Sequence, residues 1–327
     1  MSKNAASDTT DSLPEPSQIF PAGPPVVEKK ETLFLGSHFE GLGDAWEVLL
    51  GEFSEEMEEG DELSLREKLF YHICAQTLDK GVLDPSCLVL YQANNMRVAL
   101  VQSDPRKSVQ AGVLIRGDDA DSNHILVNGY PILQGLPNSM DILEAHTWSN
   151  GVEGEVLARM AGSATTPVSF FAPFYFRDFA QFEEDRRCTI FLAALALSIS
   201  QAKQKSVIID EGEFYEMELK QFLAKNTGKT AADFSGPEII LEGARMLFPS
   251  DTASCQEFRV PVLEVRYCMF FDIDLFRIRT EFVLDHVDGN DVALQGYIYA
   301  PLHLLEGYMP QVGDDIEGFL WMTGYLG

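Results

Sequence analysis

Short runs of alternating apolar and polar residues follow one another along most of the 327-residue chain, separated by glycine, proline, asparagine and aspartate. Alternation with a period of two is typical of strands that bury one face, and the intervening residue types favour turns. The sequence therefore predicts a β-rich protein. Hydrophobic residues make up 46% of the chain, which is enough for a packed core without a metal ion or disulfide.

The chain is longer than the roughly 250 to 300 residues at which a single core usually stops growing, so we expect more than one domain. Residues 1–30 are rich in Ser, Thr, Pro and Asp, and we predict a disordered acidic, proline-rich arm there. We predict a small α+β domain over residues 31–137. Residues 138–327 have the strand spacing of a barrel or a sandwich.

The predicted α+β domain combines one or two helices with an antiparallel meander. Ser64 and Glu67 form a capping box, apolar residues follow at helical spacing, and Lys80-Gly81 is typical of a helix end. Four strands are then predicted, over residues 87–92, 96–102, 111–117 and 124–133.

The second half of the chain contains nine predicted strands and one helix. The helix is predicted over residues 211–226, with Phe214, Met217, Phe222 and Leu223 near a helical period. The strands are predicted over residues 140–148, 154–161, 168–171, 188–200, 206–209, 257–274, 277–284, 292–300 and 316–326. For residues 188–200 a buried helix is the alternative.

The run FFDIDLFRIRTEFVL changes phase in its middle. Apolar residues occupy odd positions up to Leu275 and even positions from Phe276 onward. A slip of one residue predicts a β-bulge or a sharp strand bend at this point.

The C-terminal segment VGDDIEGFLWMTGYLG has the pattern GD-x-I-x-G-x-L-W-x-x-G-Y-L. This ending resembles that of an uncharacterised family of bacterial proteins, as do SFFAPFYF, FLAALALS and EFRVPVLEV. The resemblance implies an oligonucleotide/oligosaccharide-binding (OB)-like or otherwise partly open antiparallel β-barrel with a helical insertion. It implies no activity, and no site residue is carried over from it.

The charge of the chain limits its partners. Lys and Arg total 24 against 51 Asp and Glu, which gives a formal net charge of −27 at pH 7. Such a charge makes nucleic acid an unfavourable ligand and permits either a purely solubilising role or a basic protein partner. The densest acidic segment predicts an exposed loop or a docking patch, and its residues are Glu55, Glu56, Glu58, Glu59, Asp61 and Glu62.

The five cysteines are widely spaced and are expected to be reduced thiols. No apolar run reaches the roughly 18 to 20 residues of a membrane helix, so we expect a cytoplasmic protein without a membrane partner. The six histidines lack the close spacing typical of a local zinc site, and we expect no cofactor. The sequence leaves the oligomeric state open.

Few residues point to catalysis. Asp272 and Asp274 would share one strand face, and His286 follows shortly after, as in some acid-base or metal sites. An exposed acidic strand face explains them equally well. Trp321 and Tyr325 are expected in the core and at its rim, with a ligand platform as the alternative.

From these features the sequence predicts a non-catalytic binding protein that presents an acidic surface to a protein partner. A metal-assisted hydrolase that uses Asp272 and Asp274 is the first alternative. An inhibitor that mimics nucleic acid is the second.

Overall fold

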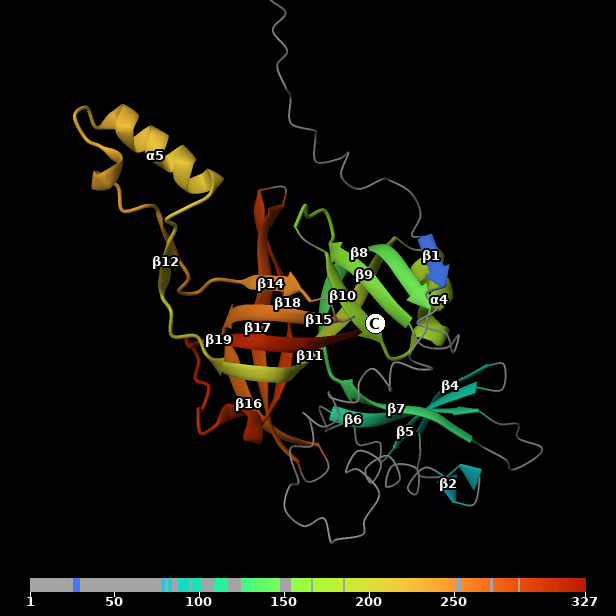
Figure 1. Cartoon of the computed structure of the whole chain (residues 1–327). Coiled ribbons are helices and arrows are strands. Elements are labelled where there is room, and N and C mark those ends of the chain that lie inside the picture. Colours follow the sequence, from blue (N-terminus) through green and yellow to red (C-terminus); the bar gives the residue numbers. More distant parts are fainter. Residues whose placement is uncertain are drawn as a thin grey trace, which may run out of the picture.

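Strands dominate the computed structural model of the protein, which confirms the prediction of a β-rich fold (Figure 1). Most strands belong to one large, mainly antiparallel sheet, and four others form a separate small sheet. The structure describes residues 26–29, 78–79, 82–83, 88–93, 96–101, 109–116, 125–147, 154–165, 167–184, 186–250, 254–270, 273–287 and 289–327.

The large sheet has the strand order β14-β15-β19-β10-β9-β8-β11-β18-β17-β16, and the short β1 (Val26–Lys29) pairs in parallel with β8. Its first four strands in the chain after β1 are β8 (Leu136–Thr147), β9 (Gly154–Met160), β10 (Val168–Ala172) and β11 (Arg187–Gln201). The others are β14 (Met246–Pro249), β15 (Cys255–Pro261), β16 (Glu264–Phe270), β17 (Ile273–Val287), β18 (Asn290–Pro301) and β19 (Asp315–Leu326).

The pairing of β19 with β11 makes part of the large sheet curl back on itself. The pairings β8–β9, β9–β10, β10–β19, β19–β11 and β11–β8 form a cycle of five strands. Its weakest link, β10–β19, consists of the single residue pair Phe171↔Thr323. Because β14 and β16 remain at the two ends of the strand order, the large sheet is not closed into a true barrel.

One core cluster fills the concave side of the curled sheet. It takes alternate residues from the strands, as the pair Ile190 and Leu192 of β11 illustrates. On β11 the intervening residues Ala193 and Leu195 are also buried, although they lie outside that cluster. The residues 188–200 therefore form a strand with two covered faces, and the helical alternative is wrong.

The small sheet has the order β4-β5-β6-β7 and is antiparallel throughout, as predicted. Its strands are β4 (Leu88–Ala93), β5 (Met96–Val101), β6 (Val109–Arg116) and β7 (Ile125–Leu133). A short pair, β2 (Leu78–Asp79) and β3 (Val82–Leu83), precedes it.

The helical half of the predicted N-terminal α+β unit is not supported. Within residues 31–137, the described part contains strands and no helix. The capping box at Ser64 and Glu67 lies outside the described residues, and Leu78–Asp79, predicted to continue that helix, belongs to β2.

A helix missed by the sequence prediction, α4 (Tyr175–Glu184), connects β10 to β11. Tyr175 and Phe182 are buried in the core cluster, and Phe179 packs against it. These residues recur at a helical spacing. Tyr175, Phe179 and Phe182 thus form one face of an amphipathic helix.

The predicted strand 257–274 is two strands. β15 ends at Pro261, and the chain then turns so that Val262 donates to the Asp314 carbonyl (2.8 Å) and Leu263 donates to the Arg279 carbonyl (2.9 Å). The following β16 pairs with β17 in an antiparallel hairpin. Proline has no N–H group for a sheet ladder, which suits it to the end of a strand.

The run FFDIDLFRIRTEFVL lies largely in β17, and its change of phase reflects burial of first one face of the strand and then the other. Leu275 and Ile278 are both fully buried, yet only Ile278 belongs to the core cluster. The pairing of β17 with β18 nevertheless runs without a shift from Leu275 to Glu281, and the irregularity lies between Glu281 and Val283. A bulge exists, but the predicted position was wrong.

An insertion between β11 and β14, residues 202–245, leaves the sheet, and we call it the arm (Figure 1). It contains the predicted helix, and its elements are β12 (Ser206–Ile208), α5 (Glu213–Lys225), η2 (Ala231–Asp233) and β13 (Glu238–Ile240).

Candidate functional site: a projecting arm and its anchor

The arm carries α5 away from both sheets on a two-stranded stalk (Figure 1). β12 and β13 form this stalk as an antiparallel pair, in the register Ser206↔Ile240 to Ile208↔Glu238. At its outer end, Gly236 has φ +86° and lies so close to Ile209 that a side chain would collide with its carbonyl oxygen. Glycine suits this turn because it adopts a positive φ readily and has no side chain to collide with Ile209.

The outer end of the arm packs on itself through an aromatic contact. The ring of Phe234 lies 5.3 Å from that of Tyr215 and 5.1 Å from that of Phe222, centroid to centroid. Asp233 accepts a hydrogen bond from the backbone N–H of Thr230 (2.8 Å), which caps η2. This small aromatic contact holds α5 against the following segment, but it leaves every residue of α5 at least partly exposed.

Large apolar side chains are uncovered along the whole arm. Phe214, Met217 and Leu223, which lie near a helical period in the sequence, are all exposed. The exposed fraction reaches 58% for Ile208 and 63% for Ile240. The full set is Ile208, Phe214, Met217, Leu223, Ile239 and Ile240. Large exposed apolar surfaces mark interaction sites in soluble proteins.

Acidic residues surround the start of α5. Residues 206–219 contain five acids and no base, and these acids are Asp210, Glu211, Glu213, Glu216 and Glu218. Within the described part of the chain, no hydrogen bond or ion pair engages these carboxylates. The helix N-terminus tolerates this charge because its macrodipole is positive there. The arm thus presents apolar side chains among free carboxylates.

Arg259 on β15 holds both ends of the arm. Its guanidinium donates to the carbonyl oxygen of Gln204 at the start of the arm and, from Nε, to that of Leu241 at its end (3.3 Å). Nη1 forms an ion pair with Oε2 of Glu317 on β19 (3.0 Å). Arg259 is only 7% exposed, and a planar guanidinium suits such a bridge because its donors point in several fixed directions.

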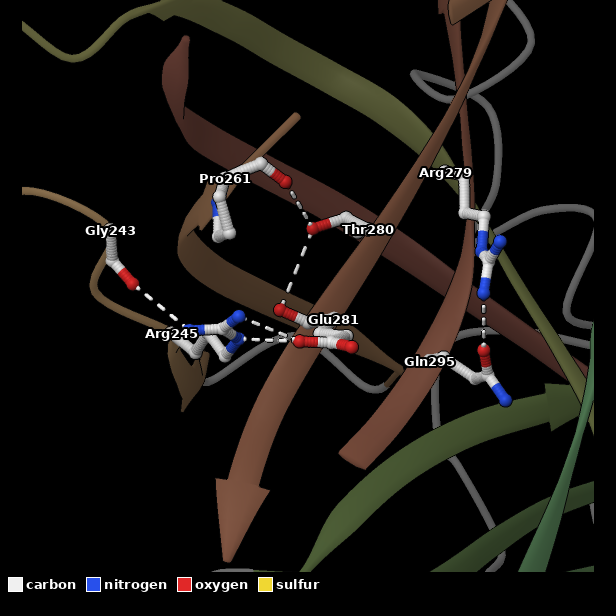
Figure 2. Close-up of polar contacts among 7 residues, drawn as sticks. All are labelled: Gly243, Arg245, Pro261, Arg279, Thr280, Glu281 and Gln295. Atoms are coloured by element: carbon white, nitrogen blue, oxygen red, sulfur yellow. Dashed lines mark hydrogen bonds and ion pairs between the residues drawn. The ribbon is translucent and has the colours of Figure 1, made fainter. Parts of the chain in front are cut away.

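A second contact fixes the end of the arm to β17 (Figure 2). Arg245 donates from Nε to Oε2 of Glu281 at 2.8 Å, and its Nη1 donates to the Gly243 carbonyl at 3.2 Å. On the sheet beside this pair, the buried Thr280 hydroxyl donates to the Pro261 carbonyl (2.8 Å). Glu281 borders the bulge in β17, so the irregular strand turns this carboxylate toward the arm.

The beginning and end of the arm also meet at one residue of β19. Asp315 accepts a backbone hydrogen bond from Ala202 at its carbonyl oxygen (2.8 Å) and one from Gly243 at Oδ2 (2.8 Å). The base of the arm is therefore tied to three strands of the large sheet. A rigid base holds the exposed side chains in fixed positions relative to the sheet.

The predicted carboxylate site is not assembled by the described residues. Asp274 and His286 lie on the same strand, β17, 286 − 274 = 12 residues apart. At about 3.3 Å per residue, this is roughly 40 Å of strand. Asp274 instead accepts a hydrogen bond from the Tyr267 hydroxyl, and this bond raises the pKa of Tyr267. Asp272 lies outside the described residues.

His286 has a partner of its own. Its Nδ1 lies 3.1 Å from Oδ1 of Asp291 across the β17–β18 hairpin. In the described part of the chain, no three His, Cys, Asp or Glu side chains are placed to hold a metal ion.

The thiols of Cys255 and Cys268 have little nucleophilic character. Burial, with a smaller effect of the Glu155 carboxylate, raises the pKa of Cys255 to about 11. Burial also raises the pKa of Cys268 to about 11. Both groups are therefore protonated at neutral pH, and the thiolate is the reactive form.

Two other sequence-based hypotheses fare differently. The acidic residues Glu55 to Glu62 lie outside the described residues, so the docking patch there stays a prediction. Trp321 is 1% exposed and its ring lies 5.5 Å from that of Phe171, which places it in the interior rather than on an open ligand platform.

Comparison of the chain with protein-family models, with curated proteins and with solved structures finds no match. The C-terminal resemblance to a bacterial family therefore stays a prediction. No described helix has the length and apolar content needed to cross a membrane. The fold and site together define a strand-rich protein with an anchored, projecting arm.

Proposed function

We propose that this chain is a non-catalytic interaction protein that docks through the arm. The partner is a protein surface that combines basic and apolar side chains. One observation carries this proposal: the arm is tied to three strands at its base, while its large apolar side chains, among free carboxylates, remain uncovered.

The two kinds of side chain have complementary roles in such docking. Burial of Phe214 and Met217 against a partner would supply apolar contact area, at about 25 cal/mol per Å² before the costs of association. The neighbouring carboxylates Glu213 and Glu216 would attract a basic surface and repel an acidic one. The net charge of −27 extends this preference to long range and opposes self-association.

We also propose that the cycle of β8, β9, β10, β19 and β11 is an OB-like unit. In chain order these strands are numbered 1 (β8), 2 (β9), 3 (β10), 4 (β11) and 5 (β19). They pair in the cyclic order 1-2-3-5-4-1, and α4 lies in the chain between strands 3 and 4. The OB fold is a partly open five-stranded barrel. β12 to β18 would then be an insertion between the last two strands, and the arm would begin that insertion. A fold alone does not define a function.

The two alternatives receive less support. The metal-assisted hydrolase rests on Asp272 and Asp274, of which the structure describes only Asp274, and His286 lies far from Asp274 along β17. Mimicry of nucleic acid rests on the acidic residues 52–62, which the structure does not describe.

Site-specific photocrosslinking tests the proposed docking site. The photoreactive p-benzoylphenylalanine is placed at position 214, and in a control at position 312, because Val312 is 69% exposed and lies outside the arm. We expect a crosslinked protein from position 214 that is absent from position 312. The segment of the partner that is crosslinked should carry Lys or Arg among apolar residues. The yield of crosslinked product should fall several-fold between 50 and 500 mM salt.

Charge reversal in the arm completes the test. We expect E213K with E216K to reduce the crosslink several-fold, while E257K, an exposed glutamate on β15, leaves it unchanged. The proposal is wrong if no crosslink depends on the position, if the captured segment is acidic, or if the captured protein is a second copy of this chain.

A further inference from the structure

An open groove of about 790 Å³ lies beside the end of β11, separate from the outer end of the arm. Four consecutive strand residues line it, Ser198 to Gln201. Successive side chains of a strand point to opposite faces, so a groove that touches four in a row borders the edge of the strand rather than one face. The opposite wall comes from η3 (Leu302–Leu305), Glu306 and Tyr308.

The groove exists because β18 leaves the side of β11. On one side, β11 stays paired with β19 as far as Gln201↔Ile316. On the other side, its parallel pairing with β18 ends at Leu195↔Tyr299. β18 ends two residues later at Pro301, which has no N–H group to donate, and η3 then turns away.

Within the described part of the chain, the second edge of β11 therefore lacks a strand over residues 196–201. Among the described strands, only β19 pairs with this stretch, and the backbone bonds of the described loops do not bridge it to residues 302–308. Alternate residues of a strand direct their N–H and C=O groups to each side. Unpaired edges of this kind are templates for another strand.

The size of the groove suits an extended peptide. Six residues of strand span roughly 20 Å. The cavity volume lies within the roughly 300 to 1,000 Å³ of common ligand sites. Ile199, Leu304 and Leu305 provide apolar contacts for alternate side chains. The remaining lining residues are polar or charged and include His303 and Glu317 of β19. Backbone pairing along an edge, with pockets for alternate side chains, is the usual mode of strand addition.

The acidic groups at the groove favour a basic peptide. Glu306 is exposed and lacks a hydrogen bond or ion pair within the described part of the chain. It also has φ +47°, a left-handed conformation that is uncommon for a residue with a side chain. Asp314 accepts a hydrogen bond from the Tyr308 hydroxyl (2.7 Å), which fixes the tyrosine wall beside that carboxylate. Lys203 is the main opposing charge.

We infer that the groove binds an extended peptide carrying basic residues, which adds as a strand to the free edge of β11. This site is independent of the docking site proposed on the arm. The peptide backbone pairs with residues 196–201, and a lysine or arginine of the peptide meets Glu306.

Fluorescence polarisation with designed peptides tests this inference on the full chain. The probes are eight-residue labelled peptides of alternating Val and Lys, alternating Val and Thr, and alternating Val and Glu. A further Val-Lys peptide carries N-methyl groups on alternate residues and therefore cannot pair along one edge. We expect affinity to fall in the order Lys, Thr, Glu, and N-methylation to weaken binding at least tenfold.

Two variants locate the binding. E306K should weaken binding of the Val-Lys peptide about fivefold or more, whereas E257K, the same charge change on an exposed residue outside the groove, should change it less than twofold. Hydrogen exchange should show new protection over residues 196–204. The melting temperature of each variant confirms that it is folded.

The inference fails if none of the peptides binds, if the N-methylated peptide binds as well as its parent, or if E257K weakens binding as much as E306K. It also fails if the protection lies elsewhere. Crosslinking from position 214 does not involve the groove, so failure of one proposal is distinguishable from failure of the other.

Discussion

At the scale of single residues, Arg259 is the side chain on which the arm most depends. Replacing Arg259 by Met removes the donors to Gln204, Leu241 and Glu317, and with them the contacts that tie both ends of the arm to β15 and β19. We expect a loss of about 2 to 3 kcal/mol in the free energy of unfolding. Urea denaturation measures it.

The matched control for this change is Arg266→Met. Arg266 is largely exposed and pairs with Glu264, two residues away on the same strand. Exposed ion pairs contribute little, so we expect a change of at most about 0.5 kcal/mol. Equal effects of the two substitutions would show that Arg259 does not hold the arm. Hydrogen exchange over residues 202–245 should rise only in the Arg259 variant.

The sequence did not reveal which residues of the arm are exposed. Tyr215 and Phe222 are seven positions apart and meet Phe234, whereas Phe214 and Met217 share a different face of the same helix. Both sets have helical spacing, so the period alone does not distinguish them. Which face of α5 is packed depends on Phe234, which contacts the helix only after the chain has turned back.

At the scale of elements, the arm is an addition to the sheet rather than a part of its core. No residue of α5 is fully buried, and the core cluster contains no arm residue. Ser206 and Ile240 are cross-strand partners, so a short Gly-Ser linker can join the chain between them. We expect this deletion to preserve a cooperative thermal transition and to lower the melting temperature by only a few degrees.

Circular dichroism at rising temperature measures this outcome. The matched comparison is a variant in which Phe234→Ala removes only the aromatic contact at the outer end of the arm. Both variants should melt close to the unmodified protein, because neither touches the core. Loss of cooperativity on deletion would show that the arm is needed to fold the sheet.

Most strands could be predicted from the sequence because alternation is a local signal. The small sheet and β8 to β11 follow their predicted segments closely, although β8 begins four residues earlier than predicted. Helix α4 was missed because its aromatic residues also fit a strand and loop until Tyr175 and Phe182 are seen in one core. No local sequence pattern predicts the free edge of β11, because this edge arises where β18, a strand distant in the sequence, ends.

At the scale of the whole molecule, the small sheet is packed against the large one. Tyr130 of β7 is 1% exposed, its ring lies 5.3 Å from that of Phe171, and its hydroxyl donates to the Pro173 carbonyl at 2.7 Å. Tyr299 of β18 similarly donates to the Gln134 carbonyl (2.9 Å), just beyond β7. β7 thereby covers part of β10 and of the turn that follows it.

These contacts predict that the two sheets unfold together. Tyr130→Phe removes one buried hydrogen bond and should cost about 1 kcal/mol, whereas Tyr130→Ala also empties the space beside Phe171 and should cost about 3 to 4 kcal/mol. Unfolding followed by circular dichroism and by tryptophan fluorescence should give coincident transitions in both variants. Two separate transitions, or an alanine variant as stable as the phenylalanine variant, would mean that β7 contributes little to the stability of the large sheet.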